Sequence, residues 1–512
     1  MPLSFSWRLL LAALSGVLLG LCFPTSSWVL LLPVALVPFF RALQDVRPLH
    51  GWLLGYAFGI AFWISTVPWI GYTVHHYGGV NAPLSALALL LTALILGTYF
   101  SALGLLVALA RPGTPLELMV VWPCAWVVQE GLRTYVLSGF PWALLGYALA
   151  AKPELIQGAA LAGTGLVTLL VVVLNVCAYL ALRHPARRLL CAGTAGALIV
   201  VAFTAGRMRI TRHEGRPSRT LRVALMQPGV LQEARWSAED RDRLYADLLA
   251  DTYVLCAREH PDLVLWPESA MVDAWPWSAR LRHDLPELCK RTGAAVLFST
   301  AWSEEPERED APYFNSALLV TGEGAVLPPY HKLRLVPFGE YVPFGSLLTR
   351  VGPISKAIPG SFTPGKEVRL LPFKSLRLGG AVCYEVIFGW IARAEARSGA
   401  DVLFTLTNDS WYGGYGAKGQ HWQAAVLRAV ETGRPLVRAA ITGRTGWVDP
   451  LGRSHTVPEE GKQSLVVDLP LATVPAPAVA LGETLLLVCA AAVAAVILRG
   501  RLVRARPEGP TR

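Results

Sequence analysis

Apolar segments separated by short polar turns fill residues 1–206, and one further apolar segment lies at residues 479–498. A helix needs about 20 predominantly apolar residues to cross the hydrocarbon core of a bilayer. We therefore expect eight membrane helices, at residues 4–23, 28–42, 52–70, 84–110, 118–136, 159–182, 189–206 and 479–498. The first also has features of a signal peptide, but Cys22-Phe23-Pro24 lacks the small residues of a cleavage site.

The stretch between these segments has the composition of a globular domain. The whole chain of 512 residues is 53% hydrophobic and only 16% charged, which is not typical of a soluble protein. We predict a seven-helix transmembrane domain at residues 1–210 and a globular domain at 219–474. An eighth transmembrane helix at 479–498 and a basic cytoplasmic tail at 499–512 complete the expected organisation.

The formal net charge of +10 comes partly from arginines that border the apolar segments. Arg41 and Arg47, Arg111, and the group around Arg183 to Arg188 occupy alternate loops, which is the bias of cytoplasmic loops. Both termini are therefore predicted to be cytoplasmic, with the globular domain on the outer side of a bacterial inner membrane. No basic stripe interleaved with aromatic residues occurs in the globular stretch, so we expect no nucleic-acid partner.

The eight cysteines are scattered singly, without a C-x-x-C pair or the spacing of a zinc site, and we expect no metal and no cofactor. Five lie in or beside the apolar segments, where packing explains them. Cys256, Cys289 and Cys383 lie in the globular stretch. A disulfide between Cys256 and Cys289 is one alternative, and two free thiols are the other.

Strand-like and helix-like patterns alternate through the globular stretch. Strands are predicted at residues 221–227, 263–266, 295–300, 315–321, 378–383 and 402–407, and helices at 238–259, 279–292 and 420–431. This alternation is typical of a layered α/β domain, in which ligand groups lie at the carboxyl ends of strands.

Three of these strand ends or adjoining loops carry Glu268, Lys332 and Cys383. A thiol that attacks a carbonyl must lose its proton, for which a carboxylate is a suitable base, and an ammonium can stabilise the oxyanion that forms. Taken singly, each residue has a simpler explanation: Cys383 as a core thiol, Glu268 as a helix cap, and Lys332 as a solvated charge. Glu340 could pair with Arg334 or with Lys332 at little energetic gain.

Together and in this order, the three residues resemble the Glu-Lys-Cys triad of the nitrilase, or carbon-nitrogen hydrolase, superfamily. Nearly the whole chain is similar to one family within it, the apolipoprotein N-acyltransferases. The stretches that carry this resemblance are Leu335 to Pro343, Cys383 to Glu385, Asn408 to Gly413, Gln420-His421, Arg428 to Glu431, and Gly139 to Trp142. The resemblance implies an α-β-β-α sandwich inserted before the last of eight membrane helices.

The resemblance also implies an acyl transfer from a membrane phospholipid to the N-terminal amine of S-diacylglyceryl-cysteine on an apolipoprotein, through a thioester on a cysteine. In this reaction Glu268 would be the base, Lys332 the oxyanion donor and Cys383 the nucleophile. By matching position, Glu340 would support Lys332, and Tyr384 and Glu385 would shape the pocket. Substrate binding would fall to three further residues, Trp236, Trp411 and Asn408.

One departure from the family pattern follows Arg438, where Ile441 stands in place of an expected Asn shortly before Gly443. We expect Thr442 to supply the missing hydrogen bond.

Another enzyme class, a membrane-tethered amidase or nitrilase, has the same triad, but eight spans exceed what anchoring requires. A transporter is a third alternative, although the spans contain little charge beyond Glu130, for which pairing with Arg133 is the simpler explanation.

Overall fold

The computed structural model describes residues 3–24, 26–215, 219–230, 238–271, 273–308, 310–343 and 362–505. These residues form two compact units. One, the helical unit, comprises Met1–Arg212, Tyr412–Gln423 and Leu481–Arg512. The other, the sheet unit, comprises His213–Trp411 and Ala424–Ala480. The short segment Tyr412–Gln423 thus groups with the helices, although it lies within the range that we predicted for the globular domain.

The helical unit contains the apolar segments. Its helices are α1 (Phe5–Leu21), α2 (Val37–Ala42), α3 (Pro48–Thr66), α4 (Trp69–His76), α5 (Ala82–Ala110), α6 (Pro115–Tyr135), α7 (Pro153–Ile156), α8 (Ala159–Ala162), α9 (Thr164–Arg183), α10 (Arg188–His213) and α18 (Thr484–Ala505). Among the described helices, four are long and apolar enough to cross a bilayer, within α5, α9, α10 and α18. The pair α3 and α4, bent by 57°, would make a fifth, so the predicted count of eight is not reached by this measure.

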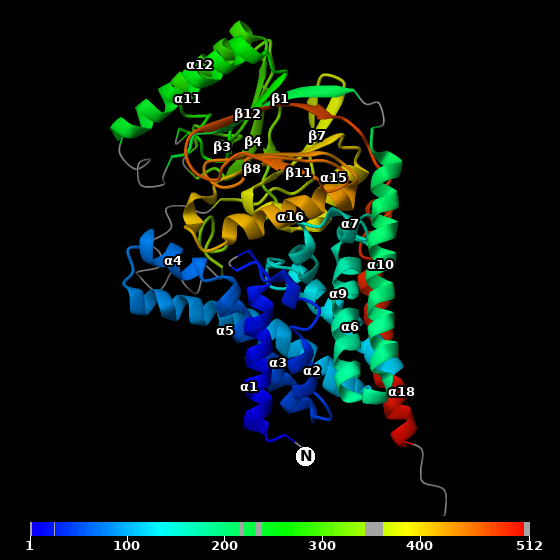
Figure 1. Cartoon of the computed structure of the whole chain (residues 1–512). Helices are drawn as coiled ribbons and strands as arrows, with labels where there is room; N and C mark the ends of the chain where they lie inside the picture. Colours follow the sequence, from blue (N-terminus) through cyan, green and yellow to red (C-terminus); the bar gives the residue numbers. More distant parts are fainter. Residues whose placement is uncertain are drawn as a thin grey trace, which may run out of the picture. The chain divides into compact units, whose positions relative to one another are not determined.

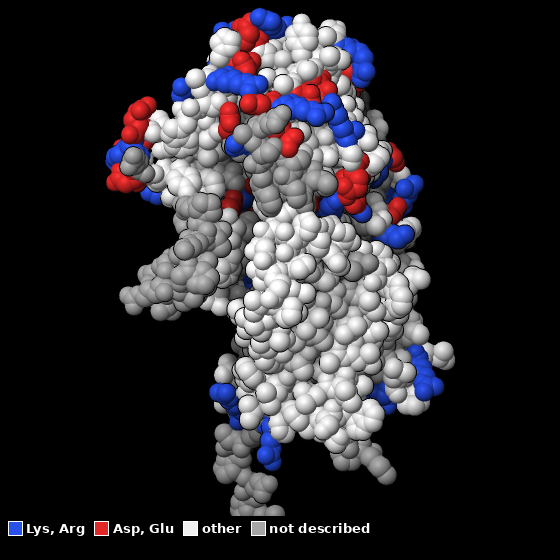
Figure 2. Space-filling model, turned by 90° about the vertical axis from the view of Figure 1, so that its left-hand side faces the viewer, with Lys and Arg blue, Asp and Glu red and all other residues white. Residues whose placement is uncertain are grey.

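The surface of this unit fits a membrane protein. Figure 2 shows a broad face of the unit without Lys, Arg, Asp or Glu. Large apolar side chains are exposed along α5, including Leu87, Leu91 and Ile95. Inside the unit, α3 and α5 pack closely at Gly55. A Cβ atom at this position would lie 2.1 Å from the carbonyl oxygen of Phe100, so there is no room for a side chain. Small residues at helix interfaces are how membrane helices approach one another.

The segment predicted as one helix at residues 28–42 is broken in the structure. Val29–Leu31 forms a 3-10 turn and α2 begins only at Val37. Pro33 lies between them, and proline lacks the backbone N–H that a continuous helix needs. The buried Asn175 of α9 accepts a hydrogen bond from Leu36 N at 2.9 Å and donates one to Leu32 O at 2.8 Å. A side chain from a neighbouring helix thus satisfies backbone groups that the break leaves free.

Trp142 and Glu130 lie in the interior of this unit. Trp142 is buried, its Nε1 donates to Gln420 Oε1 at 2.6 Å, and its ring stacks on His421. Glu130 is also buried and pairs with Arg133 at 3.5 Å, as predicted. Trp142 is therefore part of the packed interior of the unit.

The sheet unit consists of two six-stranded sheets. The first has the order β12-β1-β2-β3-β4-β5 and the second β11-β10-β9-β8-β7-β6. Each has three parallel strands at its centre, flanked by antiparallel ones. The strands are β1 (Thr220–Gln227), β2 (Leu263–Leu265), β3 (Ala295–Ser303), β4 (Tyr313–Val320), β5 (Tyr330–His331), β6 (Leu371–Phe373), β7 (Leu376–Val382), β8 (Val402–Thr407), β9 (Leu436–Ala440), β10 (Gly446–Val448), β11 (Ser454–Thr456) and β12 (Gln463–Pro470).

The two faces of the first sheet pack against different partners, which gives the unit its layers. Alternate residues such as Val223 and Leu265 enter a core that they share with Val382 and Phe404 of the second sheet. The residues between them, such as Val264, pack against α11 (Ala238–Glu259) and α12 (Ala279–Thr292). These two helices lie side by side in Figure 1. On the second sheet, α15 (Gly389–Arg397) packs against β7, and α16 (Ala417–Thr432) follows β8 in the chain.

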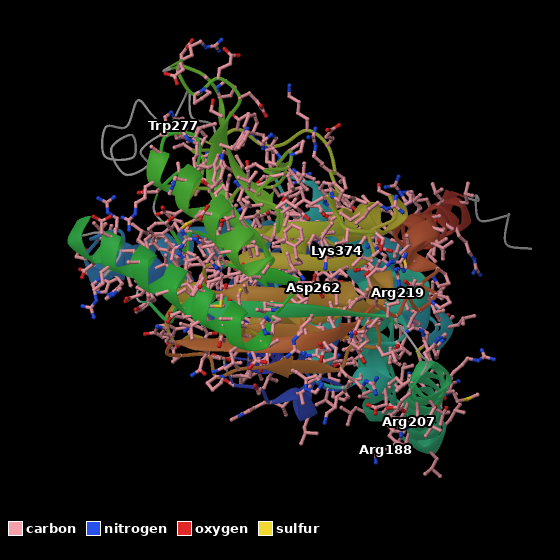
Figure 3. The ribbon with its side chains drawn as sticks, turned by 90° about the horizontal axis from the view of Figure 1, so that it is seen from above. Arg188, Arg207, Arg219, Asp262, Trp277 and Lys374 are labelled. Carbon is pink, nitrogen blue, oxygen red and sulfur yellow. The ribbon has the colours of Figure 1, made fainter. Side chains whose placement is uncertain are left out.

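The strands and helices thus form the α/β sandwich that was predicted. At one edge, Lys374 in the turn between β6 and β7 pairs with Asp262, which precedes β2, so this ion pair joins the two sheets; Figure 3 shows the two residues close together. Cys256 and Cys289 are both free and buried, so the alternative of a disulfide between them is not realised.

Candidate active site

The three predicted catalytic residues follow strands of both sheets. Glu268 lies three residues after β2, Lys332 directly after β5, and Cys383 directly after β7. All three are buried, with exposed fractions of 8%, 1% and 6%. Burial excludes the interpretation of Lys332 as a solvated loop charge. Charged residues are almost never buried without a partner.

The backbone is strained at two of these strand ends. Cys383 has a φ of +54°, and so does Ser269, which follows Glu268. Residues other than glycine seldom adopt this left-handed conformation, and each instance costs on the order of 1–3 kcal/mol. The turn places the Cys383 thiol at the start of a short 3-10 helix, Cys383–Ile387, immediately after the buried strand β7. Such strained turns cluster at active sites, where they hold a side chain in one direction.

The ammonium of Lys332 lies between two carboxylates. Its Nζ is 2.9 Å from Glu340 Oε1 and 3.5 Å from Glu268 Oε1. Burial on its own lowers the pKa of Lys332, but the charges of Glu340 and then Glu268 outweigh it, and the pKa lies above its ordinary value. Lys332 therefore remains a cation. Arg334, the other partner considered for Glu340, instead lies over the ring of Trp390.

The carboxylate of Glu268 is held on both oxygens. Asn315 Nδ2 donates to its Oε1 at 3.1 Å, and the backbone N–H of Asn408 donates to its Oε2 at 3.2 Å. The same Nδ2 atom donates to Glu340 Oε1 at 2.6 Å, so Asn315 joins the two acids. Asn315 was not identified from the sequence. It is separated from its partners by 47 and 25 residues, and its strand pattern carries no signal of this role.

The thiol of Cys383 is protonated at rest. Burial raises its pKa above the ordinary value, the negative charge of Glu268 raises it further, and Lys332 opposes both. A thiol in this state needs a base before it can attack. Of the carboxylates Glu268 and Asp409, whose charges both act on the thiol, Glu268 has the larger effect. Thr407 Oγ1 lies 3.2 Å from Cys383 Sγ.

Glu385 holds the backbone next to Cys383 and Lys332. Its carboxylate accepts hydrogen bonds from Val382 N at 2.8 Å, from Leu333 N at 2.6 Å and from Tyr330 Oη at 2.9 Å. It thus joins the turn that carries Cys383 to the loop that carries Lys332. Burial raises the pKa of Glu385 to about 7, although Lys332 and the backbone N–H groups partly oppose the rise.

The other site residues predicted from the sequence are Tyr384, Asn408, Trp411 and Trp236. Tyr384 is buried beside the ring of Phe388. Asn408 is also buried, and its Oδ1 accepts a hydrogen bond from Ser410 N at 3.2 Å. Trp411 is partly exposed. Trp236 lies outside the described residues.

The structure does not support the hydrogen bond expected from Thr442. Within the described part of the chain, the Thr442 hydroxyl is buried without a hydrogen-bond partner. The contact at this turn comes from the neighbouring backbone, where Ile441 O accepts a hydrogen bond from Gly229 N at 2.9 Å. This hydrogen bond uses the backbone of Ile441 and does not depend on its side chain.

Two family models match the chain. One is described as the apolipoprotein N-acyltransferase N-terminal domain and matches residues 15–177. The other is described as carbon-nitrogen hydrolase and matches residues 222–476, which include all three candidate catalytic residues. The two matches fall on the predicted membrane and globular parts of the chain.

Similar proteins with the name apolipoprotein N-acyltransferase occur in several bacteria. The protein of Geobacter metallireducens is 33% identical over 458 residues, which cover 86% of this chain and 85% of that protein. The protein of Vibrio cholerae is 32% identical over 468 residues, which cover 87% of this chain and 88% of that protein. The protein of Methylococcus capsulatus is 31% identical over 456 residues, covering 88% and 87%.

Solved structures similar to this chain include those of an amidase of the nitrilase superfamily from Nesterenkonia sp. AN1. One of them has a TM-score of 0.38 and 25% sequence identity, and the match covers 51% of this chain and 94% of the amidase.

Proposed function

The chain belongs to the apolipoprotein N-acyltransferase family, and from this premise we propose that Cys383, Glu268 and Lys332 carry out its reaction. The reaction transfers a fatty acyl chain from a membrane phospholipid to the N-terminal amine of S-diacylglyceryl-cysteine on an apolipoprotein. The acyl chain is carried between the two substrates as a thioester. One observation carries the assignment of roles: a buried acid, ammonium and thiol lie together at strand ends of both sheets.

The first half-reaction forms the thioester. Glu268 takes the proton from Cys383, and the thiolate attacks the ester carbonyl of the phospholipid to give a tetrahedral oxyanion. When the oxyanion collapses, the carbon–oxygen bond to the glycerol breaks. Glu268 gives its proton to the departing alkoxide, so a lysophospholipid leaves and Glu268 is a carboxylate again.

The second half-reaction forms the amide. The neutral amine of the apolipoprotein attacks the thioester carbonyl, and Glu268 takes a proton from the attacking nitrogen. The carbon–sulfur bond then breaks, and the thiolate of Cys383 recovers the proton from Glu268. The N-acylated lipoprotein is released, and the enzyme returns to its starting state.

Lys332 stabilises the oxyanion in both half-reactions. It remains a cation in its buried site, where an aimed positive charge is more effective than it would be in water. Glu340 supplies the shorter of its two carboxylate contacts and supports it in position. Asn315 holds both acids, so we add it to the supporting residues alongside Glu340, Tyr384 and Glu385.

We further propose that the chain is a multi-pass protein of the bacterial inner membrane, with eight spans and both termini cytoplasmic. Its catalytic domain, at residues 219–474, then lies on the outer side. The arginines in alternate loops support this orientation. Trp236, Trp411 and Asn408 are proposed to bind the substrates, which are a phospholipid donor and a diacylglyceryl apolipoprotein acceptor.

Mass spectrometry tests the proposal. After the purified protein is mixed with phospholipid, its intact mass should increase by one acyl chain on Cys383, and a diacylglyceryl peptide should then remove this chain. Cys383→Ala should lose both events while still inserting into membranes. Cys289→Ala, which removes another buried thiol of the same unit, is the matched control and should keep both. Retained transfer in Cys383→Ala would refute the mechanism, and release of free fatty acid alone would favour a hydrolase.

A further inference from the structure

The hydroxyl of Thr407 faces two acceptors. Thr407 is the last residue of β8 and is fully buried. Its Oγ1 lies 3.2 Å from Cys383 Sγ and 3.1 Å from Asp409 Oδ1. A hydroxyl carries a single proton, so it can donate to only one of these two atoms at a time. The charges on the sulfur of Cys383 and on the carboxylate of Asp409 therefore determine which of them accepts the hydrogen bond.

Asp409 is held as a buried ion pair. Its Oδ2 lies 2.5 Å from Arg438 Nη2, and neither side chain is exposed. Arg438 is on β9, the strand that pairs with β8. Among the described residues, the charges of Glu268, Lys332 and Asp409 act on the Cys383 thiol, and the charge of Asp409 is balanced by Arg438.

We propose that Thr407 is a further catalytic residue, whose hydroxyl donates to the sulfur of Cys383 whenever that sulfur is a thiolate and otherwise donates to Asp409. Asp409 and Arg438 are positioning residues, because Asp409 accepts from the Thr407 hydroxyl in the resting enzyme and Arg438 holds Asp409 in place. The inference rests on the proposed role of Cys383 as the nucleophile.

The chemistry of sulfur accounts for the alternation. A thiol or thioester sulfur is a weak acceptor, so the hydroxyl donates to the carboxylate of Asp409 in the resting and acylated enzyme. A thiolate is an anion and attracts the hydroxyl proton, whereas the charge of Asp409 is already balanced by Arg438. Only the direction of one O–H bond changes, and no proton leaves Thr407. The thiolate is the attacking group in the first half-reaction and the leaving group in the second, so one donor serves both.

Alkylation of Cys383 by iodoacetamide measures the thiolate directly. The full-length protein is treated in phospholipid-free detergent at several pH values, and the modified Cys383 peptide is quantified by mass spectrometry. Thr407→Val keeps the shape of the side chain but removes the donor. Losing a hydrogen bond to an anion should raise the pKa of the thiol by about one unit or more, which lowers the alkylation rate about tenfold at each pH below that pKa.

Two variants serve as controls. Thr407→Ser keeps the hydroxyl and should restore the rate of the original protein. Thr405→Val makes the same change two residues earlier on β8, where the hydroxyl is buried without a hydrogen-bond partner among the described residues, and should leave the rate unchanged. If Thr407→Val does not fold, judged by its melting temperature, the pair Thr407→Ala and Thr405→Ala makes the same comparison.

Equal alkylation rates in folded Thr407→Val and in the original protein would overturn the proposal, and so would equal losses in the variants at positions 407 and 405. Neither result would contradict the proposed role of Cys383 as the nucleophile, because the thioester on Cys383 is detected by a separate mass measurement. Absence of that thioester in the original protein would instead refute the proposed function.

Discussion

Lys332 Nζ lies 2.9 Å from Glu340 Oε1 but 3.5 Å from Glu268 Oε1. The closer acid therefore balances most of the charge of the ammonium. Glu268 is left with the longer contact to the ammonium. This difference supports the proposed roles, with Glu340 holding Lys332 in position and Glu268 transferring the proton.

Glu340→Gln should slow the formation of the thioester. Without the charge of Glu340, the ammonium shifts toward Glu268, which moves the oxyanion donor and weakens the base together. A displacement of about 1 Å at a reacting centre can cost roughly a hundredfold in rate, and we expect a loss of that order. The rate of acylation of Cys383, followed by intact mass, checks this. Glu367→Gln, which removes an exposed acid paired with Arg369, should leave the rate unchanged.

Asn315→Ala should also slow acylation, because it removes the donor shared by Glu268 and Glu340. Both carboxylates then have fewer hydrogen bonds and depend more strongly on Lys332, so we expect a loss of about tenfold or more in the same measurement. Ser316→Ala is the control, since the adjacent residue of β4 points to the other face of the sheet and contacts His331. A rate for Asn315→Ala equal to that of Ser316→Ala would remove Asn315 from the supporting residues.

The three candidate catalytic residues could be proposed from the sequence because each lies at a strand end and the three occur in a characteristic order. Asn315 and Thr407 could not, because a buried hydrogen bond joins residues that are remote in the chain. Asn315 and Thr407 are ordinary strand residues until the fold brings them to Glu268 and Cys383. Six of the twelve described strands, β1 to β4, β7 and β8, were predicted from their apolar patterns, whereas β5, β6 and β9 to β12 were not.

In the helical unit, the apolar pattern predicted a continuous helix at residues 28–42, where the structure has a break. Apolar composition marks residues 28–42 as clearly as the other segments, yet Pro33 divides them. The break is tolerated because Asn175, far away in the chain, bonds to Leu36 and Leu32. Hydropathy records that a segment is apolar but not whether its backbone is continuous.

The pKa of Glu385, raised to about 7 mainly by burial, predicts a specific pH dependence of stability. Between about pH 4.5 and pH 7 the unfolded chain loses this proton while the folded chain retains it. The stabilisation is thus fully present below the unfolded pKa and is lost as the pH rises to about 7, by about 3 kcal/mol in total.

Glu385→Gln removes this titration. Melting temperatures measured from pH 4.5 to 7 should therefore fall more steeply for the original protein than for the variant, whatever their absolute difference. The exposed Glu367→Gln should follow the curve of the original protein. Parallel curves for the original protein and Glu385→Gln would show that Glu385 does not titrate in this range.

Asn175→Leu should destabilise the helical unit without touching the catalytic residues. It leaves the N–H of Leu36 and the carbonyl of Leu32 without the partner that Asn175 provides, in an interior where water does not replace it. Each unsatisfied buried group costs about 1–3 kcal/mol, so we expect a clear fall in the melting temperature of the protein in detergent. Thr204→Val on α10 is the matched control, because its exposed hydroxyl bonds only to its own helix. If the two variants have the same melting temperature, the break at Pro33 does not depend on Asn175. The N–H of Leu36 and the carbonyl of Leu32 must then find other partners.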